Sequence, residues 1–224
     1  MKILLFDIDG TLIDSGGAGR RALVQSFREV CSIDNAMDGL PLAGKTDPLI
    51  IREAFENNGI RANNEIIARL KGSYIKHLKE QMAFTVISLM PGVGRLLEAL
   101  SNNGHRHMGL LTGNMEEGAR IKLEPLGILD YFSFGAYGSD EEDRNRLLPH
   151  AQRRYAQATG SDVPASGFAV IGDTTRDVAC AKPYGAMSIA VATGFHTMEQ
   201  LRAAGPDVLL ADLLDTEGFL KLVG

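Results

Sequence analysis

The sequence predicts an α/β fold: a Rossmann-like parallel sheet flanked by helices, with a small all-helical segment inserted after the first strand. From Pro91 onward, short apolar runs alternate with amphipathic segments, which is typical of parallel strands joined by helices. Before Pro91, one apolar run at Ile3–Phe6 is followed by roughly seventy residues with helical spacing only. A chain of 224 residues is long enough for one large core and a smaller unit.

Composition narrows the class of protein. Hydrophobic content of 45%, charged content of 23% and the absence of Trp are typical of a soluble globular chain. A net charge of −5 without a Lys/Arg cluster disfavours nucleic acid as a partner. The two cysteines, Cys31 and Cys180, are too few for a disulfide framework, so we expect a cytoplasmic protein. A signal peptide and a membrane span are not expected, because acidic residues follow within seven positions and no apolar run approaches ~20 residues.

The first strand ends in two carboxylates, in the stretch KILLFDIDGTLID. The run Ile3–Phe6 is typical of a strand buried on both faces, and period-two spacing puts Asp7 and Asp9 on one side of it. Gly10 then allows a turn and Thr11 offers a hydroxyl. At about 4 Å, two like charges repel by roughly 1 kcal/mol in water and roughly 4 kcal/mol at an effective dielectric near 20. The pair therefore indicates a metal-binding nucleophile site, with a plain strand-to-turn exit as the alternative.

The segment after the glycine-rich joint at 15–19 is predicted to be a helical bundle of its own. We expect residues 16–87 to form this unit, and residues 1–15 and 88–224 to form the α/β core, with Pro91-Gly92 marking the return. Apolar residues at spacings of three and four define three helical faces: Leu23, Phe27 and Val30; Ile51 and Phe55; and Ile67, Leu70, Tyr74, Leu78 and Met82.

Inside this segment, residues 39–46 read GLPLAGKT and match the P-loop pattern G-x-x-x-x-G-K-[ST]. A P-loop needs a buried strand before it, and the preceding CSIDNAMD does not read as one. Pro41 also lacks the N–H that a phosphate cradle requires. We therefore favour a loop between two helices, with Lys45 directed at an anionic group, and keep a nucleotide hydrolase as the alternative.

The second half of the chain alternates helices and strands. A strongly amphipathic helix begins at Val93, and Thr197 with Gln200 suits a capping box. The predicted strands, which join Ile3–Phe6, are Met108–Leu111, Phe132–Gly135, Phe168–Ile171, Ser188–Ala192 and Val208–Leu210. Further helices are predicted near 115–126, 149–159, 176–182, 197 and 213–222.

Polar residues follow two of these strands, at the sheet edge where α/β proteins bind ligands. Thr112, Gly113 and Asn114 offer a hydroxyl, a flexible backbone and an amide before a helix, which suits a phosphate or an ordinary helix cap. Asp173 and Asp177 follow another strand and are four residues apart, so they lie on one side if a helix opens there.

Together with Asp7 and Asp9, this pair would bring four carboxylates to one edge of the sheet. Such a cluster needs a divalent cation, and an all-oxygen ligand set suits Mg²⁺.

These motifs in this order resemble the haloacid dehalogenase-like (HAD) superfamily, closest to its magnesium-dependent phosphatases with a helical (C1-type) cap, such as phosphoglycolate phosphatase. Residues 7–11, DIDGT, resemble the first motif of the family, D-x-D-G-T, and Thr112 resembles the second. Residues 172–177 resemble the fourth, G-D-x-x-x-D. The helical segment falls where the family places its cap, and the likeness covers nearly the whole chain.

The third motif departs from the family, which usually has Lys followed by Pro. This chain reads DRNRLLP at 143–149, and counting back from Pro149 assigns Arg146 to the lysine position, with Arg144 as the alternative. Arginine can pair bidentately with a phosphate or an aspartate, so the positive charge is kept.

The resemblance implies a role for each motif. Asp7 would attack phosphorus to form an aspartyl-phosphate, and Asp9 would protonate the leaving oxygen and then activate water. Mg²⁺ would be held by the Asp7 carboxylate, the Asp9 carbonyl, Asp173 and Asp177.

The remaining residues would bind the substrate, a small phosphorylated metabolite. Thr112, Arg146 and backbone N–H groups near Gly10 and Thr11 would neutralise the transferring group. Lys45 would meet the part of the substrate beyond the phosphate, and whether His150 contacts phosphate stays open. The protein is expected to be a monomer or homodimer.

Several alternatives stay open. A phosphomutase of the same superfamily, β-phosphoglucomutase-like, would use the same residues, whereas a dehalogenase is disfavoured because halide departure needs no acid such as Asp9. A catalytically silent binding protein is a further possibility. His105 and His107 are expected in solvent beside Arg106.

Overall fold

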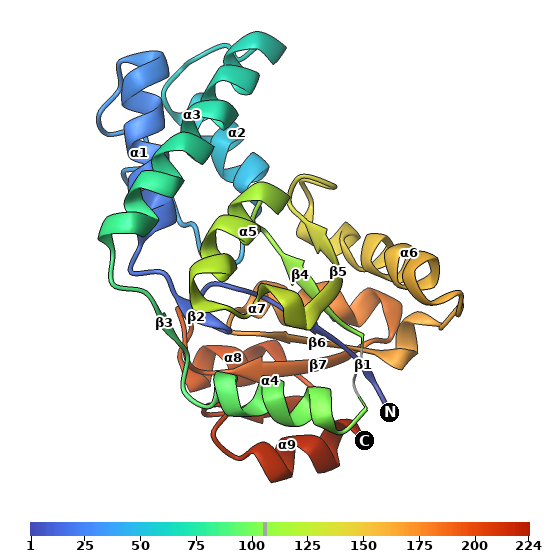
Figure 1. The fold of residues 1–224 in the computed structure, drawn as a ribbon. Coiled ribbons are helices and arrows are strands. Elements are labelled where there is room, and N and C mark those ends of the chain that lie inside the picture. Colours follow the sequence, from blue (N-terminus) through green and yellow to red (C-terminus); the bar gives the residue numbers. More distant parts are fainter. Residues whose placement is uncertain (105–106) are drawn as a thin grey trace.

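The structure, a computed structural model, describes residues 1–104 and 107–224 and is built on one parallel sheet (Figure 1). The six strands lie in the order β5-β4-β1-β6-β7-β8. Their bounds in chain order are β1 Ile3–Phe6, β4 Met108–Thr112, β5 Phe132–Tyr137, β6 Phe168–Gly172, β7 Met187–Val191 and β8 Val208–Leu210. The α/β fold is confirmed, and every predicted strand occurs within two residues of its predicted ends.

The central strand β1 has parallel neighbours on both sides. Leu5 is in register with Gly109 of β4 and with Val170 of β6. Because parallel strands point the same way, the carboxyl ends of these three strands lie together at one edge of the sheet. The chain termini lie at the other end, where the Lys2 N–H donates to the Val223 carbonyl at 2.8 Å.

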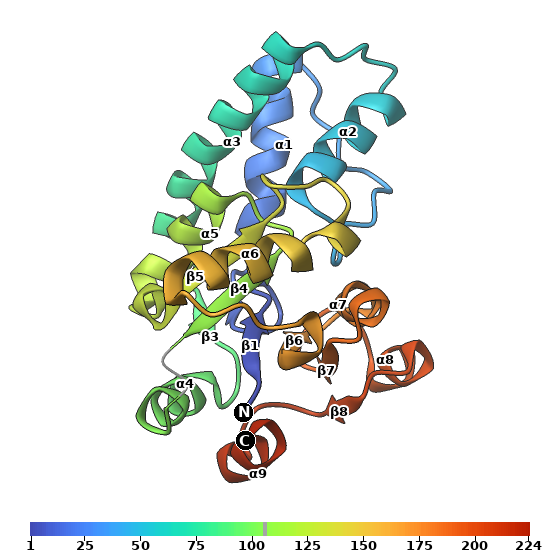
Figure 2. The ribbon, with the colours of Figure 1, turned by 90° about the vertical axis from the view of Figure 1, so that its right-hand side faces the viewer.

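Helices cover both faces of the sheet (Figure 2). On one face, an apolar core lies between β1 and three helices, namely α4 Val93–Asn102, α5 Glu116–Leu123 and α9 Thr216–Val223. On the other face lie α6 Leu148–Thr159, α7 Thr175–Ala181 and α8 Met198–Ala204. The capping box of Thr197 and Gln200 is confirmed at the start of α8.

The helical insert, named here for residues 18–84, stands beside the carboxyl edge of the sheet (Figure 1). It consists of α1 Ala18–Cys31, α2 Asp47–Asn57 and α3 Asn64–Phe84, which share a core of their own. The Phe27 and Phe55 rings pack 5.0 Å apart within it. The chain enters and leaves through two strands that periodicity did not predict, β2 Ile13–Asp14 and β3 Ser88–Leu89, which pair antiparallel. Two-residue strands are too short to show a period.

The insert is docked onto the sheet edge. Met115 and Ile121 beside β4 pack into the insert core. The Asp47 N–H donates to the Gly113 carbonyl at 2.7 Å. A side chain at Gly113 would collide with the Lys45 carbonyl, so only glycine permits this approach.

The GLPLAGKT stretch is an irregular loop that leads into α2, with Thr46 as the N-cap. Residues 32–46, all described, contain no strand, so the element that a P-loop requires before its glycines is missing. No helix in the described parts of the chain combines the length and apolar composition needed to cross a membrane. His107 is exposed, whereas His105 and Arg106 lie outside the described residues.

Candidate active site

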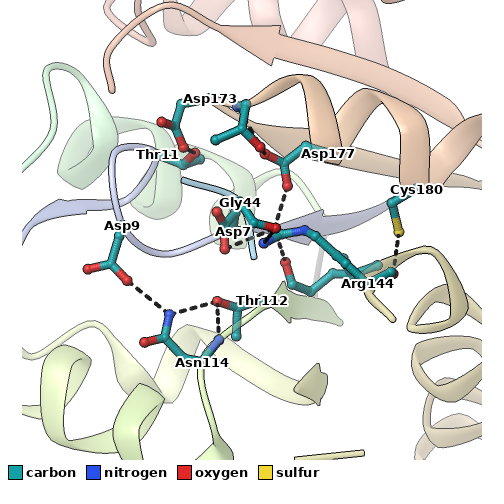
Figure 3. Close-up of polar contacts among 12 residues, drawn as sticks. Asp7, Asp9, Thr11, Gly44, Thr112, Asn114, Arg144, Asp173, Asp177 and Cys180 are labelled. Atoms are coloured by element: carbon teal, nitrogen blue, oxygen red, sulfur yellow. Dashed lines mark hydrogen bonds and ion pairs between the residues drawn. The ribbon is translucent and has the colours of Figure 1, made fainter. Parts of the chain in front are cut away.

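Loops after three adjacent strands converge at the carboxyl edge of the sheet (Figure 3). Asp7 follows β1, Thr112 ends β4, and Asp173 follows β6. The β1 loop turns at Gly10, whose φ is +81°, and a Cβ there would lie 2.5 Å from a carboxylate oxygen of Asp173. Glycine suits this position for two reasons: it adopts the left-handed backbone conformation without strain, and its missing side chain lets the two loops approach closely.

Asp7, Asp173 and Asp177 form a buried carboxylate cluster. One oxygen of each lies within 4.8 Å of the others, and their exposed fractions are 5%, 0% and 2%. Arg144 forms ion pairs with Asp7, at 3.2 Å, and with Asp177. Three carboxylates face one guanidinium, so two negative charges stay uncompensated when all three are ionised, and the candidate ligand atoms are all oxygens. These residues therefore fit a divalent cation.

The charges in this cluster repel one another. Burial raises the pKa of Asp7 to about 6, against the opposing charge of Arg144. Burial, together with repulsion from Asp177 and Asp7, raises the pKa of Asp173 to about 8. Burial alone would lower the pKa of Arg144, but Asp177 and Asp7 outweigh it and raise that pKa. A divalent cation would relieve the repulsion that remains.

Arg144, and not Arg146, occupies the site. Arg144 is 4% exposed, and its guanidinium also donates to the carbonyls of Gly44, at 3.2 Å, and Leu111, at 3.4 Å. The side chain of Arg146 is 68% exposed and lies 3.5 Å from Glu141. The placement of Arg146 by counting from Pro149 is wrong. The two arginines share a 3₁₀ turn, where residues two apart point in different directions.

Asp9 has a different set of neighbours. Its carboxylate accepts hydrogen bonds from Ser15 Oγ at 2.7 Å, Asn114 Nδ2 at 2.9 Å and Lys122 Nζ at 2.6 Å. Burial alone would raise the pKa of Asp9, but Lys122, together with the hydrogen bonds from Asn114 and Ser15, outweighs burial and lowers the pKa. Figure 3 shows the carboxylate turned toward Asn114 and away from Arg144. The expected contribution of Asp9 to a metal concerns its carbonyl, and stays a prediction.

Several of the groups predicted to bind phosphate form hydrogen bonds within the protein. Thr112 Oγ1 accepts hydrogen bonds from the Asn114 N–H, at 3.3 Å, and from Asn114 Nδ2, at 2.9 Å. The Gly10 N–H donates to the Ile13 carbonyl, at 2.9 Å, and the Thr11 N–H lies 3.3 Å from the Ile8 carbonyl. The structure therefore does not present these two N–H groups to a ligand. Thr11 Oγ1 instead donates to Asp173, at 3.1 Å.

A cavity of about 200 Å³ lies between the insert and the sheet edge. Its lining includes the sequence-predicted residues Asp7, Asp9, Lys45, Thr112, Gly113 and Asn114, together with Arg144. Lys45 reaches it from the insert, with its ammonium ion-paired to Glu53. His150 lies on α6, where Nδ1 is 2.9 Å from Arg153 Nη2.

Sequence reasoning missed three buried polar residues near Asp9, namely Lys122, Asp47 and Tyr74, which are 4%, 7% and 1% exposed. The sequence does indicate that Lys122 is buried, because it lies three residues after Ala119 and beside Leu123, on the apolar side of α5. The sequence does not single out the other two residues. An acidic residue such as Asp47 is ordinary in the first turn of a helix, and Tyr74 fits the apolar face of its helix.

Comparison with known proteins adds independent information. Residues 4–191 match the family described as "Haloacid dehalogenase-like hydrolase". The chain is 28% identical over 226 residues to "Phosphoglycolate phosphatase" of Synechococcus elongatus, with 96% of each chain covered. It is 26% identical over 223 residues to "Probable phosphatase IndB" of Dickeya dadantii, with 96% of this chain and 92% of the relative covered.

Solved structures agree on the fold. A structure from Haemophilus somnus, described as a predicted phosphoglycolate phosphatase, has a TM-score of 0.72 at 19% identity and covers 100% of this chain and 98% of its own. CbbY from Rhodobacter sphaeroides, in complex with phosphate, has a TM-score of 0.73 at 20% identity, with 96% of each chain covered. At these identities, both structures support the fold alone.

Proposed function

This chain belongs to the haloacid dehalogenase-like hydrolase family, and we propose that it is a magnesium-dependent phosphatase that hydrolyses small phosphate monoesters. The observation that carries the proposal is the buried cluster of Asp7, Asp173 and Asp177 with Arg144. Of these residues, Asp7 and Arg144 line the cavity, together with Thr112. Several curated relatives across nearly the full chain are named phosphatases, which favours hydrolysis over phosphoryl transfer to a sugar.

Mg²⁺, held by Asp7, Asp173 and Asp177, would supply positive charge to the phosphate and the nucleophile. An Asp7 oxygen attacks phosphorus, the bond between phosphorus and the ester oxygen breaks, and an aspartyl-phosphate forms. A water molecule then attacks this phosphorus, which releases inorganic phosphate and restores Asp7. The raised pKa of Asp7 reflects burial beside other carboxylates, and Arg144 keeps the group oriented by its ion pair.

Asp9 would give a proton to the departing ester oxygen and then take one from the attacking water. It lines the same cavity as Asp7 from the same loop, and its carboxylate faces the side where the insert lies. Thr112 and Arg144 would bind the phosphoryl oxygens. Arg144 takes over here the role that the sequence assigned to Arg146.

We further propose that the insert, with domain boundaries at residues 16 and 87, acts as a cap that selects the leaving group. Arg20, Lys45 and Tyr74 reach the cavity from its helices and loops. Two of these carry positive charge, so we expect esters with a second anionic group, phosphoglycolate among them, as suggested by the names of the relatives.

Release of inorganic phosphate from p-nitrophenyl phosphate and from phosphoglycolate, measured with and without Mg²⁺, tests the proposal. Activity should appear with Mg²⁺, stop with EDTA and return when Mg²⁺ is added in excess. Undiminished turnover in metal-free buffer would contradict it. Conversion of a sugar phosphate to its isomer without phosphate release would identify a mutase instead.

A further inference from the structure

The two walls of the active-site cavity differ in polarity. The core supplies mainly polar groups to the lining, among them Asp7, Thr112 and Arg144. The side chains that the insert adds to the lining are mainly apolar, namely Leu23, Leu42, Ala43, Ile50 and the ring of Tyr74. When the core holds the phosphate, the part of the substrate beyond the ester oxygen therefore meets an apolar wall.

The two cations on the insert wall have partners within the insert. The ammonium of Lys45 is ion-paired with Glu53, and only 8% of the lysine side chain is exposed. The guanidinium of Arg20 donates to the Met37 carbonyl at 3.3 Å and lies 3.9 Å from Asp38. An anionic group of the substrate would share these cations with their present partners, whereas a carbon chain meets no such competition.

The loop after β7 adds an exposed aromatic ring from the core side. Of the five large apolar side chains that are exposed in the described part of the chain, Phe195, at 67%, is the one that lines the cavity. Its N–H donates to Asp173 Oδ2 at 2.9 Å, and Thr193 Oγ1 donates to the Gly10 carbonyl at 2.7 Å. The ring is thus held at the cavity by an anchored loop. An apolar surface fixed in this way gains by leaving water and gives up little conformational entropy.

Leu42 of the insert and Phe195 of the core belong to loops that meet. Gly44 lies against the β6 loop, since a Cβ there would be 2.5 Å from Thr174 Oγ1. The residue after Thr174 donates its N–H to His196 Nδ1 at 2.9 Å, which ties the β6 loop to the loop after β7. Both apolar side chains therefore line the cavity from loops that join the insert to the core.

We propose that the alcohol part of the substrate carries an apolar chain or ring, which packs against Leu42 and Phe195 while the core holds the phosphate. The inference rests on the phosphatase function proposed above and adds the chemical class of the leaving group. Each methylene that leaves water on this wall contributes favourable transfer free energy. Sugar phosphates are disfavoured, because their hydroxyl groups would lose hydrogen bonds to water against apolar side chains.

Kinetics of the wild-type protein on ethyl, butyl and hexyl phosphate with Mg²⁺ measure this preference directly. The three leaving alcohols are of similar acidity, so the chemical step needs the same help in each case. The value of kcat/KM should rise about threefold for each added methylene, because each one is buried on binding. A series that stays flat or falls with chain length would overturn the inference.

Variants of two exposed phenylalanines locate the effect. Phe195→Ser should lower the ratio of kcat/KM for hexyl over ethyl phosphate about tenfold, and Phe195→Leu should keep the ratio within about threefold of wild type. Phe84→Ser is the matched control, because Phe84 is 91% exposed and does not line the cavity. It should keep the ratio within about twofold. Because both rates come from one preparation, any loss of folded protein cancels in the ratio.

An unchanged ratio in Phe195→Ser, or an equal reduction in Phe84→Ser, would also overturn the inference. If the wild-type protein still hydrolyses p-nitrophenyl phosphate or phosphoglycolate with Mg²⁺, the proposed function stands and the inference alone fails. If it hydrolyses none of these esters, both fail.

Discussion

Two clusters of buried charge lie side by side at the carboxyl edge of the sheet, and they are built differently. The sheet-edge cluster comes from the core alone and consists of Asp7, Asp173, Asp177 and Arg144. The junction cluster draws on both the core and the insert and consists of Asp9, Asn114, Lys122, Asp47 and Tyr74. The first has three carboxylates for one cation and fits a divalent ion. The second has two carboxylates near one ammonium, together with an amide and a phenol.

The difference shows how neighbours set the chemistry of two carboxylates on one loop. Asp7 and Asp9 are two residues apart, yet the pKa of Asp7 is raised to about 6 and the pKa of Asp9 is lowered. Burial acts in the same direction on both, and Lys122, together with hydrogen bonds from Asn114 and Ser15, reverses the result for Asp9. The carboxylate of Asp7 thus pairs with Arg144, whereas that of Asp9 is held by Ser15, Asn114 and Lys122.

Removing each carboxylate in turn tests this contrast with the largest expected effects. Asp7→Asn should reduce turnover of every ester by at least about 10³-fold, because no aspartyl-phosphate can form. Asp9→Asn should slow phosphoglycolate by roughly 10²- to 10⁴-fold, the range for general acid–base catalysis, and p-nitrophenyl phosphate far less. Phosphate release measures the rates, and a hydroxylamine-sensitive phosphoprotein should be missing only from Asp7→Asn. Wild-type turnover in Asp7→Asn would contradict the mechanism.

Arg144 and Arg146 offer a matched pair of arginines. Arg144→Met removes the guanidinium between Asp7 and Asp177, and should lower kcat/KM by roughly 10²-fold for both esters. Arg146→Met removes an exposed side chain and should change kcat/KM by less than about twofold. Steady-state kinetics on the two variants give the comparison. A larger loss from Arg146→Met would restore the assignment made from the position of Pro149.

The junction cluster should make the free energy of unfolding depend on pH. The pKa of Asp47 is raised to about 6, so its contribution to stability is present in acid, below about pH 4, and is lost as pH rises through about 6. The amide of Asp47→Asn does not ionise, so the variant does not lose this stability as pH rises. The variant should therefore gain about 2–3 kcal/mol relative to wild type between pH 4 and pH 7. Urea unfolding at several pH values measures the difference, and a gap that stays constant with pH would contradict the prediction.

Lys45 tests whether the insert also selects the leaving group, with the smallest expected effect. Its ammonium lines the cavity while bound to Glu53. Lys45→Ala should raise KM for phosphoglycolate about tenfold and leave p-nitrophenyl phosphate unchanged, because only the first carries a second anionic group. The nucleotide hydrolase reading predicts the opposite pattern, in which Lys45→Ala abolishes nucleotide hydrolysis while Asp7→Asn matters little. Assays of both variants on ATP and both esters decide between these patterns.

The sequence alone determined the features that depend on local order. Apolar runs identified all six strands of the sheet, and helical spacing identified the three insert helices, because burial repeats with the period of each element. The carboxylates after β1 and β6 could be placed at one edge because strands that run in the same direction bring their ends together. These inferences need only the direction of the chain and its periodicity.

Only the tertiary structure decided which cations meet those carboxylates. Arg144 and Arg146 lie in an irregular loop, where no period tells which side chain points inward, so counting from Pro149 selected the wrong one. Asp47 and Met115 are 68 positions apart in sequence and meet because the insert docks beside α5. Such contacts depend on the relative placement of two packed units. That placement follows from apolar burial and backbone contacts summed over the whole interface, and no single stretch of sequence contains it.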